Sequence, residues 1–156
     1  MPEIIALDPG PKESAYVVWD GEKVLWANEF ENNELADRLR HWGETKHTTL
    51  FMPQDYPVLV IEWISGFGIP AGSDIFETCR WVGRFQEAYR GVSKLVTRKK
   101  VKEHLQAVND KFVRQALIAR FGEPGTKKAP GTLYGVTGHR VAALAVAVTY
   151  FDLYLS

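Results

Sequence analysis

Two apolar runs in this chain each end in a carboxylate. The first runs from Ile4 to Asp8 and the second from Val58 to Glu62. Short runs of this kind are typical of buried strands, and a buried charge without a partner is expensive. If the two strands are neighbours, Asp8 and Glu62 meet at one end of the sheet, where carboxylate oxygens can bind a hard divalent cation such as Mg²⁺. For either acid taken alone, a helix cap or a salt bridge at the rim is the commoner role.

The order of the remaining strand and helix patterns predicts the fold class. Further strand patterns cover residues 14–19, 23–30 and 95–96, and the Asp20-Gly21 pair between the first two favours a hairpin turn. Helical patterns begin at five capping positions: Asn32 or Asn33, the region of Asp74, Thr97, Asp110 and the region of Gly138. Strands that first form a meander and then alternate with helices predict an α/β fold, a mixed five-stranded sheet flanked by helices.

The helix expected at 74–89 carries one apolar stripe. Ile75, Cys79, Val82 and Phe85 recur at helical spacing along it. Such a stripe either packs into the core or forms a dimer face, and the sequence does not separate the two.

Length and composition favour one domain, 1–156. The chain has 156 residues and 46% of them are hydrophobic, which is enough for a core. Cys79 is the only cysteine, so no disulfide can form within the chain, and this fits a reducing compartment. The N-terminus has no signal-peptide pattern and no apolar stretch is long enough to span a bilayer. We therefore expect a protein of the bacterial or phage-infected host cytoplasm, without membrane contact.

The charges are polarised along the chain although the formal net charge is zero. Residues 1–62 carry 12 acidic and 5 basic side chains, whereas residues 89–130 carry 11 basic and 3 acidic ones. A chain of this kind can present a basic face to nucleic-acid phosphates. The densest basic segment lies at a predicted helix start, and the candidate phosphate contacts are Arg98, Lys99, Lys100, Lys102 and Lys111. A solvated helix surface is an equally common role for any single lysine.

Two further residues are candidates for the site. His139 lies in the first turn of the last apolar helix, from which it can ligate a metal or accept a proton from water. A lone histidine in such a place is more often part of the core. Phe67 lies in the glycine-rich segment Ser65–Gly68, where it can stack on an unpaired base. His41, His47 and His104 are expected on the surface.

Several segments together resemble the RuvC family of Holliday-junction resolvases, in its phage and prophage branch. The segments cover nearly the whole chain, and their order and spacing carry the resemblance more than any single motif: 5–10 (Ile-Ala-Leu-Asp-Pro-Gly), 60–62 (Val-Ile-Glu), 76–85, 98–102, 113–117 and 139–147. The resemblance implies a ribonuclease H-like fold, a homodimer, branched double-stranded DNA as partner, and Mg²⁺- or Mn²⁺-dependent nicking. It also implies that Asp8, Glu62 and His139 act as metal ligands and catalytic residues.

The chain departs from the family pattern at one ligand position. The family's closing helix carries an acid or histidine followed three residues later by an aspartate. Here His139 is followed by Ala142. Either three ligands and more water suffice, or a neighbour such as Asp74 or Asp110 substitutes, or the molecule is inactive. Asp152 lies too far along the same helix to point the same way.

Three functions follow as hypotheses. The leading one is a Mg²⁺-dependent crossover junction endodeoxyribonuclease that cleaves four-way or branched DNA. The second is a junction-binding protein with weak or no nuclease activity, because Ala142 replaces the expected aspartate. An actin-like phosphotransferase is the third, but the turn at 9–13 lacks the small hydroxyl residues that cradle phosphate, and the chain is short for two lobes.

Overall fold

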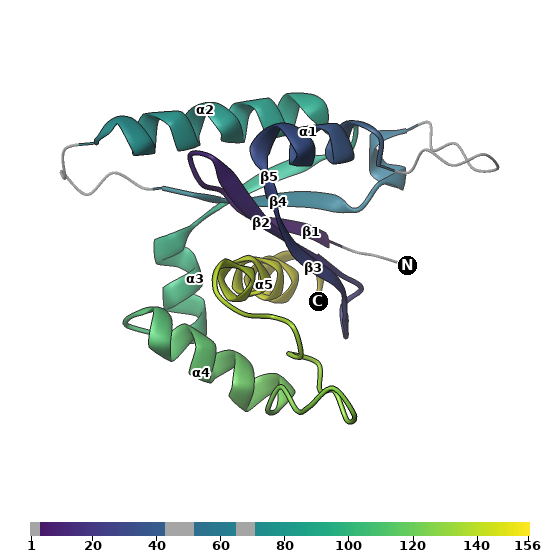
Figure 1. The fold of residues 1–156 in the computed structure, drawn as a ribbon, viewed down its shortest axis with the longest axis vertical. Helices are drawn as coiled ribbons and strands as arrows, with labels where there is room; N and C mark the ends of the chain where they lie inside the picture. Colours follow the sequence, from purple (N-terminus) through teal and green to yellow (C-terminus); the bar gives the residue numbers. More distant parts are fainter. Residues whose placement is uncertain (1–3, 43–51, 65–70) are drawn as a thin grey trace.

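The computed structural model describes residues 4–42, 52–64 and 71–156. Its centre is a five-stranded sheet in the order β3-β2-β1-β4-β5 (Figure 1). β1 pairs antiparallel with β2 and β2 with β3, whereas β1 pairs parallel with β4 and β4 with β5. The strands are β1 (Ile4–Asp8), β2 (Glu13–Trp19), β3 (Val24–Glu31), β4 (Val58–Trp63) and β5 (Ser93–Thr97). The predicted mixed sheet is confirmed.

Helices cover both faces of this sheet. α1 and α2 lie on one face, and α5 lies on the other with α3 and α4 beyond it (Figure 1). The α-helices are α1 (Asn32–Arg40), α2 (Ser73–Ala88), α3 (Arg98–Leu105), α4 (Asp110–Phe121) and α5 (His139–Tyr150). A short 3₁₀ helix, η1 (Pro53–Asp55), precedes β4, and a π-helical segment, η2 (Phe151–Leu155), follows α5. Within the described part of the chain, no helix is long and apolar enough to cross a membrane.

Side chains of β1 alternate between the two cores. Ile4 and Ala6 pack with α5, whereas Ile5 and Leu7 pack with α1 and α2. This is the period of two expected for a strand covered on both sides. Asp8, the last residue of β1, therefore lies on the α5 face.

A polar network holds the turn that follows β1. The Ser14 hydroxyl accepts from the Gly10 backbone N–H at 3.1 Å and donates to Asn32 Oδ1 at 2.7 Å. Asn32 Nδ2 donates to the Gly10 carbonyl at 2.9 Å. A Cβ on Gly10 would overlap the Glu13 carbonyl oxygen, so the turn needs glycine. The turn is thus clamped to the start of α1 immediately beyond Asp8.

Neither Asn32 nor Asn33 caps α1, so the prediction of a cap at one of these two residues was wrong. The N-cap is Glu31, whose carboxylate accepts from the Asn33 backbone N–H at 3.1 Å. Two other local predictions also need correction. Asn109 rather than Asp110 caps α4. The buried stripe of α2 runs through Thr78, Trp81, Val82, Phe85 and Ala88, so the stripe is core, and Cys79 lies only at its margin.

Candidate active site

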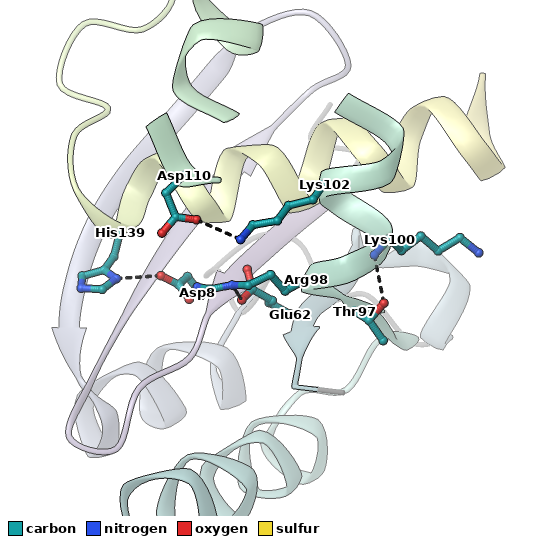
Figure 2. Close-up of polar contacts among 8 residues, drawn as sticks. All are labelled: Asp8, Glu62, Thr97, Arg98, Lys100, Lys102, Asp110 and His139. Atoms are coloured by element: carbon teal, nitrogen blue, oxygen red, sulfur yellow. Dashed lines mark hydrogen bonds and ion pairs between the residues drawn. The ribbon is translucent and has the colours of Figure 1, made fainter. Parts of the chain in front are cut away.

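The acid pair, Asp8 and Glu62, lies at the carboxyl ends of β1 and β4. These strands are parallel neighbours and Leu7 is paired with Ile61, so Asp8 and Glu62 occupy the next positions in register. Ala6 and Val60, two residues earlier on each strand, both belong to the α5-side core, so the two acids share that face. Each is only 7% exposed. The predicted convergence is confirmed (Figure 2).

His139 contacts the first acid from the start of α5. Its Nδ1 lies 2.9 Å from Asp8 Oδ2, and its side chain is 79% exposed. The preceding residue, Gly138, has φ of 56°, a left-handed conformation that glycine adopts without strain, and it is the N-cap of the helix. The helix N-terminus thus points toward Asp8, where its partial positive charge favours the carboxylate.

Arg98 contacts the second acid. Its Nε donates to Glu62 Oε1 at 2.9 Å (Figure 2). The sheet explains this contact. β5 follows β4 in parallel with Trp63 opposite Thr97, so Arg98, the first residue of α3, begins next to the end of β4. The Arg98 side chain remains half exposed.

Burial dominates the electrostatics of the acid pair. It raises the pKa of Asp8, while the hydrogen bond and charge of His139 oppose the rise. Burial also raises the pKa of Glu62, and the negative charge of Asp8 raises it further, whereas Arg98 lowers it. Asp110, at the start of α4, adds a smaller push in the same direction on both acids. An added cation at this position would relieve the desolvated charges.

Two clefts meet at Arg98. One, of about 480 Å³, is lined by Asp8, His139 and Arg98 together with the clamped turn and Thr78 of α2. The other, of about 540 Å³, is lined by Arg98, Lys99, Lys102 and Glu103 of α3 and by residues 106–108, which follow the helix. Arg98 therefore stands between an acidic recess and a basic, partly apolar groove.

The donor set fits one hard cation. In the described part of the chain no group of three His, Cys, Asp or Glu side chains gathers closely enough to hold a metal ion. Two adjacent carboxylates completed by water are nevertheless a usual environment for Mg²⁺. Ala142, one turn beyond His139 on α5, supplies no oxygen.

The other candidate substitutes for the missing carboxylate differ in position. Asp110 interacts electrostatically with both acids, but its side chain is 79% exposed and its nearest cation is Lys102, whose Nζ lies 3.7 Å away. Asp74 is in the first turn of α2, on the opposite face of the sheet. Asp152 lies beyond α5, in η2, where Arg120 and His104 hold its carboxylate away from the acid pair. His104 is thus a partly exposed residue whose Nε2 lies 2.8 Å from Asp152 Oδ2.

The predicted phosphate contacts have different environments. Lys99 and Lys102 line the basic groove with Arg98. The Lys100 side chain points away from the acid pair (Figure 2). Its amine donates to the Tyr154 hydroxyl at 3.0 Å. Lys111 is exposed on the first turn of α4. Phe67 lies outside the described residues. The Arg98–Glu62 contact is the feature that the sequence did not reveal.

Strand order, helices on both faces and acids at the ends of two parallel strands make up a ribonuclease H-like fold. Solved structures share this fold. The chain is similar to Thermus thermophilus RuvC in complex with Holliday junction substrate, with 18% sequence identity, 97% of this chain and 95% of that chain covered, and a TM-score of 0.61. A second structure of Thermus thermophilus RuvC gives 15% identity, 96% and 95% coverage, and a TM-score of 0.64. No protein-family model and no curated protein sequence matches the chain.

Proposed function

We propose that the protein is a structure-selective DNA endonuclease that cleaves four-way (Holliday) or branched junctions by metal-dependent phosphodiester hydrolysis. The observation that carries the proposal is the acid pair, buried side by side beneath the N-terminus of α5 with His139 on one acid. The fold, shared with a RuvC structure solved in complex with a Holliday junction substrate, supports DNA as the substrate.

Asp8 and Glu62 would hold Mg²⁺, or Mn²⁺ in its place, through their carboxylate oxygens. When bound, such an ion supplies Lewis-acid stabilisation of the scissile phosphate and a more acidic water. His139 has a separate part in this proposal. With Nδ1–H donating to Asp8, its Nε2 is the lone-pair nitrogen and can accept a proton from the attacking water. Asp8 thereby orients the imidazole.

The basic groove would hold the DNA backbone. Lys99 and Lys102 line it, and Lys111 extends the positive surface onto α4. The groove joins the acid cleft at Arg98, so a strand bound to the groove would pass the acid pair. We further propose that the chain acts as a single nuclease domain and a homodimer, because a four-way junction offers two equivalent strands to a two-fold molecule. Bacterial or phage-infected host cytoplasm is the proposed compartment.

A nicking assay tests this function. The protein is incubated with a labelled synthetic four-way junction, a matched linear duplex and either Mg²⁺, Mn²⁺ or EDTA. We expect paired nicks on the junction only, and only with a divalent ion. Equal cleavage of the linear duplex would contradict structure selectivity, and cleavage in EDTA would contradict metal dependence.

The second candidate function is junction binding without cleavage. Ala142 favours it, because it leaves no oxygen one turn beyond His139 on α5. Gel-shift measurements beside the nicking assay separate the two functions. Tight binding to the junction with no product in Mg²⁺ or Mn²⁺, and product from the Ala142→Asp variant, would support the binding protein over the endonuclease.

A further inference from the structure

A permanent cation already stands beside the acid pair. The guanidinium of Arg98 donates through Nε to Glu62 Oε1 at 2.9 Å, and its charge also acts on Asp8. Arg98 comes from α3, whereas the acids come from β1 and β4, so three elements separate in sequence create this charge arrangement. Arginine keeps its charge at any physiological pH, unlike histidine or a carboxylic acid.

The same guanidinium faces the cleft in which a phosphate would lie. Arg98 lines that cleft together with Asp8 and His139, and half of its side chain is exposed. A guanidinium has five N–H donors, and only the one on Nε bonds Glu62. Across the described segments, its two terminal nitrogens make no other side-chain hydrogen bond. They remain available for the planar, two-pronged recognition of a phosphate.

The ligand set is too small for two divalent ions. Two carboxylates and water can complete one hard cation, but the position one turn beyond His139 is Ala142, which has no donor. The charges of the site also favour one divalent ion and not two. The acid pair balances one divalent ion, and the positive charge of Arg98 opposes the entry of a second.

We propose that Arg98 is the second cation of this site. Each chain then binds one divalent ion, and the Arg98 guanidinium stabilises the scissile phosphate in place of a second ion. The inference rests on the proposed endonuclease function. Arg98 would hold Glu62 toward the bound ion through Nε and donate from its terminal nitrogens to a non-bridging phosphate oxygen. Ala142 removes a carboxylate ligand and with it the place of a second ion. The positive charge of Arg98 would take the part of that ion.

Metal titrations without DNA test the count directly. Mn²⁺ alone is titrated into the protein and followed by calorimetry and by the electron paramagnetic resonance of free Mn²⁺. We expect one ion per chain. The Arg98→Gln variant should still bind one ion, but about tenfold more tightly, because a monovalent and a divalent cation roughly 6 Å apart repel by that much even at the dielectric constant of water. The double variant Arg98→Gln with Ala142→Asp should bind two.

Two further variants control for charge and for folding. Arg40→Gln removes one positive charge from an exposed ion pair on α1, on the opposite face of the sheet, and should leave Mn²⁺ affinity unchanged. Arg98→Lys keeps the charge and should bind Mn²⁺ with near-native affinity, which shows that a tighter Arg98→Gln site does not come from local unfolding. Two ions bound to the native chain, or equal affinities for the Gln and Lys variants, would overturn the inference.

Single-turnover nicking of the junction then separates this inference from the proposed function. If Arg98 touches the phosphate, Arg98→Gln cleaves about 100-fold more slowly despite its tighter metal binding. If Arg98 only holds Glu62 in place, cleavage follows metal affinity and does not fall, which contradicts the proposal. A native protein that binds one ion but nicks nothing would contradict the endonuclease and keep the metal count.

Discussion

Replacing Glu62 by Gln isolates the charge of the buried acid from its shape. The amide oxygen can still accept from Arg98 Nε, which bonds Glu62 Oε1 at 2.9 Å in the native protein. The variant loses the repulsion from Asp8. For strands about 4.8 Å apart and an effective dielectric constant of about 20, that repulsion is about 3–4 kcal/mol.

The variant also loses the attraction to Arg98, which has a similar size and the opposite sign. Since the Arg98 side chain is half exposed, solvent screens that attraction, and it offsets only part of the lost repulsion. We therefore expect the Glu62→Gln protein in EDTA at neutral pH to be as stable as the native protein or more stable, by up to roughly 1 kcal/mol. The corresponding rise in Tm is up to about 2–4 °C.

The functional effect should be large by comparison. Junction cleavage should fall at least about 100-fold, because the variant lacks a charged ligand at the reacting phosphate. Junction affinity should stay within roughly threefold, since the DNA contacts lie in the basic groove. Glu34→Gln, which removes an exposed acid from α1, serves as the matched control. Loss of binding together with cleavage, or a marked fall in Tm, would refute the role assigned to this acid.

Three further predictions concern the clamp, the pH dependence and the groove. Asn32→Ala removes the acceptor of the Ser14 hydroxyl proton and the side-chain donor to the Gly10 carbonyl. It should therefore lower the free energy of unfolding by about 2–4 kcal/mol and Tm by roughly 5–15 °C. Asn33→Ala, on the exposed side of α1, should change little in the same thermal melts. Burial raises the pKa of both members of the acid pair above the ordinary values of 3.8 for Asp8 and 4.5 for Glu62. In EDTA the contribution of each acid to stability is therefore fully present below its ordinary pKa and is lost as pH rises through its folded pKa. Melts of the native protein should show this loss and its recovery with Mg²⁺, and melts of Glu62→Gln should show less of both; equal slopes in the two proteins would contradict the prediction. Lys102→Ala should reduce the slope of log binding constant against log salt by about one phosphate contact, and Lys100→Ala, whose amine bonds Tyr154, should reduce it less; the reverse order would place the DNA on the other side of α3.

The acid pair was predictable because it depends on patterns that a sequence carries directly. An apolar run of strand length that ends in a carboxylate indicates both the element and the uncompensated charge at its end. Two such runs, ending at Asp8 and Glu62, indicate a shared edge once the strands are taken as neighbours. His139 was placed by the apolar helix that it begins. The structure confirms all three positions. For the two acids the physical reason is that burial on both faces of the sheet leaves the strands little freedom of register.

The role of Arg98 was not predictable from its own neighbourhood. In sequence it is the first of several basic residues at a helix start, a pattern that indicates phosphate contacts. Its contact with Glu62 depends on β5 lying next to β4 in parallel, with Val96 opposite Glu62. That pairing is a property of the sheet as a whole, and no local pattern in residues 93–102 encodes it.

Asn32 shows a second limit of sequence patterns. An asparagine ahead of an amphipathic helix is a common cap, and Glu31 is a less common one. The structure instead uses the Asn32 amide for a contact with Gly10, 22 residues earlier. A side chain that can donate and accept at once suits either role, so only the fold decides between them.

Stability and function act in opposite directions at this edge of the sheet. The acid pair is buried at the ends of two strands, where ionisation is unfavourable, and its partners are a half-exposed guanidinium and an exposed imidazole. Solvent screens the interactions of both partners with the acids, so in the absence of metal these interactions offset only part of the free-energy cost of burying the two carboxylates. Asn32 holds the backbone beyond Asp8 through one buried and one partly buried hydrogen bond, and neither bond involves Asp8 or Glu62. This end of the sheet stays ordered although the negative charges of the acid pair are not fully balanced, so binding of a cation there should stabilise the folded protein. We therefore expect metal to raise Tm in the native protein more than in Glu62→Gln.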